Sequence, residues 1–104
     1  MKFVASSTEL LSHLQAISRV ISTKNTLPIL DNFLFTLSGN ELEITASDLE
    51  TTLITRMTLD NIDGAGTIAL PARILLDTLK EFSEQPLTFD INAETLAVVI
   101  NSEN

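Results

Sequence analysis

Asp48 and Glu50 are the nearest approach to a catalytic or metal-binding pair in this sequence. Two neighbouring carboxylates can hold a hard cation or act as general acid and base. The two residues stand at the turn that enters a predicted strand, where positions two apart share one face. No further ligands cluster beside them in the sequence, so a solvated or turn-capping role is the favoured interpretation.

His13 is the only histidine, and the chain contains no cysteine. A nucleophilic dyad or a thiolate metal site therefore has no second member, and a disulfide scaffold is excluded. On a helical projection His13 flanks the apolar stripe of its helix. A half-buried packing role is more common for such a histidine than a catalytic role.

The sequence also lacks a glycine-rich phosphate-binding loop and an aromatic surface on which bases could stack. Its three glycines are scattered and form no phosphate-binding loop. Trp and Tyr are absent, and the five Phe residues fall at core-type positions, so no surface is available on which single-stranded bases could stack. These observations favour a structural module over an enzyme.

Length and composition place the chain among single globular domains. It has 104 residues, 44% of them hydrophobic, which supports one modest core. Its formal net charge of −8, taken alone, disfavours binding to nucleic acid. The N-terminus lacks the apolar run of a signal peptide, and no stretch approaches the roughly 18 apolar residues of a membrane span. We therefore expect a cytoplasmic location and no membrane partner.

The first half of the chain has the order strand, helix and three strands. Residues 2–5 form a short apolar stretch typical of a strand, and Ser6 to Glu9 matches a capping box, with Ser6 as the N-cap. A helix is predicted over about residues 7–22 by apolar residues at helical spacing. These residues are Leu10, Leu11, Leu14, Ile17 and Ile21. Residues 33–37 and 41–45 alternate as a hairpin around the tight-turn signal Gly39-Asn40.

A third strand is predicted over residues 51–59, followed by a polar loop over 60–66, and then the pattern begins again. Residues 67–70 predict a strand, and Pro71 stands at a helix start, where its missing N–H costs little. The apolar residues of this second helix repeat the spacing of the first. They are Leu75, Leu76, Leu79 and Phe82. Residues 87–91 and 96–100 alternate as a second hairpin.

The repeated order predicts an α+β domain made of two strand–helix–hairpin repeats. We expect an antiparallel sheet with two helices packed on one face. The second repeat has no counterpart of residues 51–59, so we interpret residues 1–104 as a single domain truncated at its C-terminal side. An absent strand would leave residues 96–100 as an unpaired edge, which favours association or lowers stability. Chance repetition in an α+β domain is the alternative.

Charge is distributed unevenly between the predicted helices and strands. Opposite its apolar stripe the first helix carries Arg19, and the second carries Arg73, Asp77 and Lys80. Each helix is close to neutral as a whole, so the net charge of −8 belongs to the strands and connections. If both helices share one face, that face tolerates a polyanion which the other side repels. Helix charges balanced only for solubility are the alternative.

Four short stretches occur in the order found in a known family. They are Met1-Lys2-Phe3, Thr26 to Asn32, Ser47 to Glu50, and Leu70 to Arg73 leading to Asp77. Together they resemble the bacterial DNA sliding clamp, the beta subunit that tethers the replicative DNA polymerase, over nearly all 104 residues. The resemblance implies the DNA clamp fold, in which helices line the hole of a ring and sheets form its outer wall.

The resemblance also implies what the chain does. Each clamp chain has three such domains and closes as a head-to-tail homodimer, and this sequence resembles the first domain. The resemblance therefore implies a non-catalytic accessory subunit of a DNA polymerase that needs no cofactor. It implies binding to duplex DNA that is independent of sequence and that is weak for this fragment. The replicative polymerase and the clamp loader are partners of the full-length protein. The fragment should neither close a ring nor bind the usual client peptide.

Four residues are expected to face DNA. Lys24 and Arg73 fall on positions that carry basic, DNA-facing residues in the family, whereas Arg19 and Lys80 are inferred from the helical projection. Two other function classes stay open. One is a stand-alone protein-interaction module that uses an open sheet edge. The other is an acid-dependent enzyme built on Asp48 and Glu50.

Overall fold

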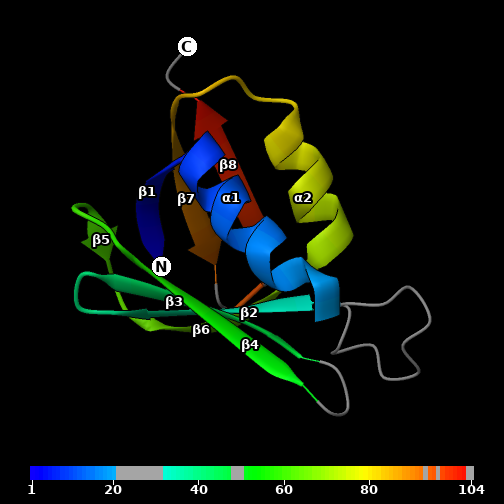
Figure 1. Cartoon of the computed structure of the whole chain (residues 1–104). Helices are drawn as coiled ribbons and strands as arrows, with labels where there is room; N and C mark the ends of the chain where they lie inside the picture. Colours follow the sequence, from blue (N-terminus) through cyan, green and yellow to red (C-terminus); the bar gives the residue numbers. More distant parts are fainter. Residues whose placement is uncertain (21–31, 48–50, 93, 96, 103–104) are drawn as a thin grey trace.

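The computed structural model describes residues 1–20, 32–47, 51–92, 94–95 and 97–102 (Figure 1). It contains two α-helices, a short 3-10 helix and eight strands in these residues. In chain order they are β1 Lys2–Ser6, α1 Ser7–Ile17, η1 Ser18–Val20, β2 Asn32–Ser38, β3 Glu41–Ser47, β4 Thr52–Thr58, β5 Ile62–Asp63, β6 Gly66–Pro71, α2 Ala72–Lys80, β7 Pro86–Asn92 and β8 Ala97–Ser102.

Helix α1 begins where its sequence predicts. Ser6 has extended backbone angles and its hydroxyl oxygen accepts a hydrogen bond from the Glu9 N–H at 3.4 Å, which confirms the N-cap. The α-helix ends earlier than the predicted residue 22, and η1 continues it to Val20. The Ser18 hydroxyl donates to the Gln15 carbonyl oxygen at 3.0 Å, a local bond that competes with regular helix pairing.

Helix α2 begins directly after Pro71, as predicted. Pro71 occupies the N-cap position with no side-chain capping bond, and its fixed φ suits a helix start. Leu75 and Leu79 point into the core, while Arg73 and Lys80 are exposed. The 3.6-residue period therefore gives the correct buried face for this helix.

The strands divide between two antiparallel sheets, with the orders β5-β1-β7-β8 and β4-β3-β2-β6. The α+β class and the two strand–helix–hairpin repeats are confirmed, whereas the expectation of one sheet is wrong. Strand β1 pairs with β7 of the second repeat, and β6 pairs with β2 of the first. Strand alternation specifies which face is buried but not which strand is the neighbour.

Strand β5 is a second difference from the sequence prediction. Residues 60–66 were expected to form a loop, yet Ile62 lies opposite Phe3 and Asp63 lies opposite Lys2. Two paired residues are too few to show an alternating pattern in the sequence. Among the described residues, the second repeat has no counterpart of β4, as predicted.

A single core joins the two sheets and both helices. Phe3 of β1 stacks on Phe89 of β7 with ring centroids 4.7 Å apart, and it lies 6.4 Å from the ring of Phe35 in the other sheet. These rings are almost completely buried. Figure 1 shows α1 and α2 side by side on the same side of both sheets, and the two helices contact each other. Among the described residues, no helix is long and apolar enough to cross a membrane.

The β2–β3 hairpin turns at Gly39, as predicted, and it supplies a stability test. Gly39 has φ +62, and no atom lies within 4 Å of the place where a Cβ would stand. Gly39→Ala should lower the free energy of unfolding by about 1 kcal/mol, because an L-residue is disfavoured in this backbone region. Urea unfolding measures the loss. Gly39→Asn should cost less, since Asn tolerates the left-handed region; equal stability of all three chains would contradict the interpretation.

Candidate nucleic-acid interface

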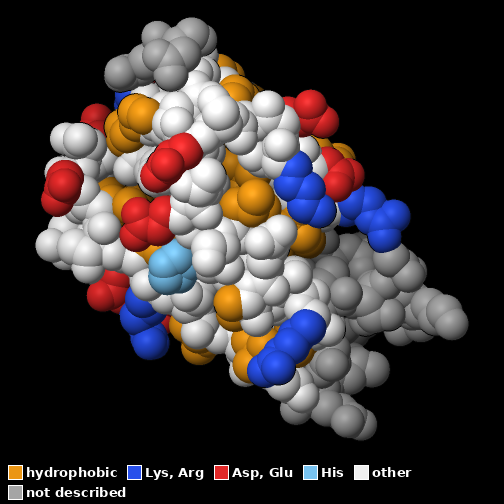
Figure 2. Space-filling model, turned by 45° about the horizontal axis from the view of Figure 1, so that its top comes forward, with side chains coloured by type: hydrophobic (Ala, Val, Ile, Leu, Met, Phe, Trp, Pro, Cys, Tyr) orange, Lys and Arg blue, Asp and Glu red, His pale blue; other side chains and the backbone are white. Residues whose placement is uncertain are grey.

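The outer surface of the two helices is the candidate interface, and we call it the helix layer. On α1 and η1 most of its exposed side chains are uncharged. The exposed residues are Thr8, Glu9, Ser12, Gln15, Ala16 and Arg19. Figure 2 shows Lys and Arg side chains scattered over this side of the molecule, with uncharged side chains and several Asp and Glu side chains among them. Such a surface offers a polyanion scattered contacts and no dense basic patch.

Helix α2 supplies the other cations of the helix layer. Arg73, Asp77 and Lys80 are all exposed, as the helical projection predicts. Arg73 and Lys80 are seven positions apart, which is about 10 Å along the helix axis. In Figure 1 the end of α1 that leads into η1 lies beside the start of α2, so Arg19 and Arg73 lie at the same end of the helix pair.

Arg73 occupies the first turn of α2, where the helix dipole disfavours a cation. That turn contains no acidic residue, and Pro71 provides no side-chain cap for its N–H groups. The position therefore costs a little helix stability. Arg73 also places its guanidinium at the helix end whose N–H groups have no side-chain cap. Both the guanidinium and these N–H groups favour binding of an anion such as a phosphate.

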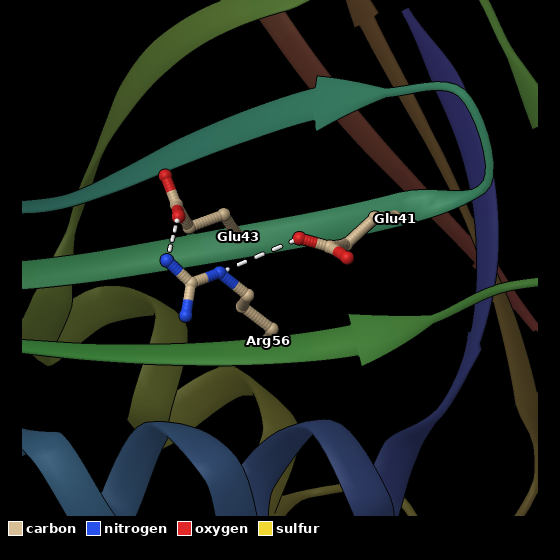
Figure 3. Close-up of polar contacts among 3 residues, drawn as sticks. All are labelled: Glu41, Glu43 and Arg56. Atoms are coloured by element: carbon tan, nitrogen blue, oxygen red, sulfur yellow. Dashed lines mark ion pairs between the residues drawn. The ribbon is translucent and has the colours of Figure 1, made fainter.

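The cations of the helix layer are free of ion pairs among the described residues. In that part of the chain every ion pair involves Arg56, which lies on β4. Its Nη2 is 2.8 Å from Glu43 Oε1, and its Nε is 3.5 Å from Glu41 Oε1 (Figure 3). Arg19, Arg73 and Lys80 therefore remain available to a ligand, whereas Arg56 offsets acids of its own sheet.

Most of the described acidic residues lie on the strands and their connections, while Glu9, Asp77 and the C-cap residue Glu81 lie on or directly beside the helices. The exposed carboxylates of the strands and their connections include Asp60, Asp63, Asp90 and Glu94. Within α1 and α2 the acidic residues are Glu9 and Asp77 only. The described structure thus agrees with the uneven charge distribution inferred from the sequence, in which the helix layer is near neutral.

His13 has the half-buried position that the sequence predicts. Its Nδ1 lies 2.6 Å from the Thr55 hydroxyl oxygen, a hydrogen bond that joins α1 to β4. No local pattern in the sequence indicates Thr55 as the partner, because the two residues are 42 positions apart. This bond positions the first helix against the edge strand of its sheet.

Three of the predicted residues lie outside the described part of the chain. They are Lys24, which was expected to face DNA, and the carboxylate pair Asp48 and Glu50. In the residues that are described, no group of three or more His, Asp or Glu side chains is placed to hold a metal ion. The helix layer is therefore the site that the structure describes in most detail.

Comparison with known proteins gives one consistent family. The family model of the DNA polymerase III beta subunit, N-terminal domain, matches residues 1–104. The beta sliding clamp of Vibrio cholerae is 43% identical over 77 residues, covering 74% of this chain and 21% of the relative. The beta sliding clamp of Pseudomonas aeruginosa is 33% identical over 102 residues, covering 98% of this chain and 28% of the relative.

Solved structures agree with these relatives. A crystal structure of the DNA polymerase sliding clamp from Pseudomonas aeruginosa superposes with a TM-score of 0.89 at 28% identity, over all of this chain and 28% of that one. A sliding clamp from Caulobacter crescentus gives 0.88 at 27% identity with the same coverage. The chain thus spans about a quarter of the relatives' length, and it belongs to the DNA polymerase III beta subunit family, the bacterial sliding clamps, by the N-terminal domain of that family.

Proposed function

We propose that residues 1–104 form the first domain of a sliding clamp, a non-catalytic processivity factor of the replicative DNA polymerase. The full-length protein closes as a homodimeric ring around duplex DNA in the cytoplasm, slides on it and tethers the polymerase after a clamp loader has placed it. The observation that carries this proposal is the helix layer, whose cations have no ion-pair partner among the described residues, while most of the described acids lie on the strands and their connections.

Loose electrostatic contact is what a sliding ring requires. A closed ring holds DNA by enclosing it, so tight phosphate contacts would only slow its movement. Each neutralised phosphate adds about 0.9 to the slope of log K against log salt concentration. Separated cations on a near-neutral surface keep that number small. Phosphate contacts also carry no base information, which suits a protein that must pass over every sequence.

The residues proposed to contact phosphates are Arg19, Arg73 and Lys80 of the helix layer, together with Lys24. Support for Arg73 comes from its place at the uncapped start of α2. Support for Arg19 comes from the adjacent end of α1, because the two cations lie at one end of the helix pair (Figure 1). Lys80 extends the same surface along α2.

The test is duplex binding by this chain as a function of salt. We expect weak binding to fluorescent duplexes of unrelated sequence, with equal affinity for each, that is lost at moderate salt. The triple variant Arg19→Gln, Arg73→Gln and Lys80→Gln should reduce the salt slope by about 2.7, since three phosphate contacts are removed. Fluorescence anisotropy at several salt concentrations measures both quantities.

Arg56→Gln is the matched control, because it removes one positive charge from β4 and leaves the helix layer unchanged. It should leave the salt slope unaltered. A triple variant that binds like the unmodified chain would exclude the helix layer as the interface. Tight binding to one particular sequence would contradict the clamp function itself.

A further inference from the structure

The chain passes from one sheet to the other through a very short connection. Strand β5 ends at Asp63 in the sheet that contains β1, and β6 begins at Gly66 in the sheet that contains β2. Only Gly64 and Ala65 lie between them. Gly64 has φ +91 and Gly66 has φ +148, backbone conformations that a residue with a Cβ rarely adopts. The tight closure of this connection therefore depends on glycine.

This connection, which we call the hinge, divides the described chain into two parts that fold onto each other. The first part contains β1 to β5 with α1, and the second part, which begins at Gly66, contains β6, α2, β7 and β8. Strand β7 of the second part pairs with β1, strand β6 pairs with β2, and the two helices contact each other. Each sheet thus contains strands of both parts.

The contacts between the two parts do not involve the hinge. Phe3 stacks on Phe89, and the Ser7 hydroxyl bonds with the Ser83 carbonyl oxygen and the Gln85 N–H. The same contacts therefore form whether the two parts belong to one chain or to two chains. A short, strained hinge favours exchange between chains, because an opened hinge runs extended and loses its strain.

We propose that two copies of this chain exchange their second parts about the hinge. The partner is a second copy, whose β6 pairs with β2 and whose β7 pairs with β1 of the first copy. Arg19 belongs to the first part and Arg73 to the second, so the exchanged dimer rebuilds the helix layer from both copies. The closed monomer and the exchanged dimer differ at the hinge, and protein concentration during folding sets their ratio.

Disulfide cross-linking tests the exchange, because the chain has no cysteine of its own. Thr36 on β2 lies opposite Thr67 on β6, and their hydroxyl oxygens are 3.3 Å apart. Directly paired residues have Cα atoms about 4.5–5.5 Å apart, which is within disulfide range. Thr36→Cys and Thr67→Cys are placed on separate chains of different size, which are unfolded together, refolded at high concentration and oxidised. We expect a disulfide that joins the two chains.

Two controls separate exchange from random collision and from surface association. Thr58 is exposed on β4 of the same sheet but lies opposite Glu41, so Thr58→Cys should form little disulfide with Thr36→Cys. The folded Thr36→Cys and Thr67→Cys chains, mixed without unfolding, should also form little, because exchange requires the closed chain to open. A yield from joint refolding that is no higher than either control overturns the proposal.

Substitution in the hinge tests what drives the exchange. Gly64→Ala disfavours the closed hinge of each chain by about tenfold, so dimerisation, which opens two hinges, should strengthen by about a hundredfold. Gly39→Ala is the matched control, since Gly39 also has a positive φ but joins β2 to β3 within the first part, where exchange relieves no strain. It should dimerise like the unmodified chain.

Sedimentation equilibrium of chains refolded at several concentrations measures the dimer fraction. A glycine-rich insertion after Gly64 gives the opposite change, because a longer hinge closes without strain and should lower the dimer fraction. Equal dimer fractions for Gly64→Ala and Gly39→Ala, or an insertion that leaves the dimer fraction unchanged, overturn the proposal.

Discussion

Phe89→Ala is expected to lower the free energy of unfolding by about 3–5 kcal/mol, the largest single-residue effect in this domain. The Phe89 side chain is 0% exposed on β7, and its ring lies almost parallel to that of Phe3, 4.7 Å away. Phe3 is also 6.4 Å from Phe35 in the other sheet. Truncation would leave a cavity where β1 meets the second repeat, so both sheets lose contacts.

Urea unfolding followed by far-ultraviolet circular dichroism measures this loss, because the chain has no Trp or Tyr to report by fluorescence. A total stability of about 5–15 kcal/mol is usual for a domain, so the variant would lose a large part of it. Phe89→Leu, which keeps most of the apolar volume, is the control and should cost clearly less. A loss below about 1 kcal/mol for Phe89→Ala would show that the stacked pair is not central to the core.

Ser7→Ala is expected to lower the free energy of unfolding by about 2 kcal/mol. Ser7 is 1% exposed at the start of α1. Its hydroxyl donates to the Ser83 carbonyl oxygen at 2.9 Å and accepts from the Gln85 N–H at 3.2 Å. The Ser7 N–H also donates to the Gln85 carbonyl oxygen at 2.9 Å. Alanine leaves the buried Gln85 N–H without the hydroxyl oxygen that accepts from it, while the Ser83 carbonyl oxygen keeps the Gln85 Nε2 donor at 3.2 Å.

Ser12→Ala separates this effect from a general change in helix α1. Ser12 is exposed on the same helix, and its replacement should change stability by less than about 0.5 kcal/mol. Thermal unfolding of both variants gives the comparison. Equal transition temperatures for Ser7→Ala and Ser12→Ala would show that the bonds between α1 and residues 83–85 contribute nothing.

Local patterns in the sequence predicted most of the elements and their buried faces. The Ser6 cap, the apolar spacing of Leu10, Leu14 and Ile17, and the start of α2 after Pro71 all depend on residues within one turn of each other. The hairpin at Gly39 depends on two residues. Because these signals are local, the folded chain preserves them, and the exposed cations of the helix layer follow from the same helical period.

Contacts between distant residues could not be predicted in this way. The hydrogen bond of His13 to Thr55, the bonds of Ser7 to residues 83 and 85, and the ion pairs of Arg56 each join separate elements. Arg56 meets Glu43 only because β3 and β4 pair in the register that places them opposite each other. A different register would give Arg56 another partner.

The sequence by itself determined two strand–helix–hairpin repeats, the buried face of each element and a helix pair that carries little net charge. Only the tertiary structure decided that β1 pairs with β7 and β6 with β2, which divides the strands between two sheets around one core. It also decided that the chain passes from one sheet to the other between β5 and β6. The physical reason is that side-chain alternation is recorded locally, whereas backbone hydrogen-bond groups are the same in every strand, so packing of the whole chain selects the neighbours.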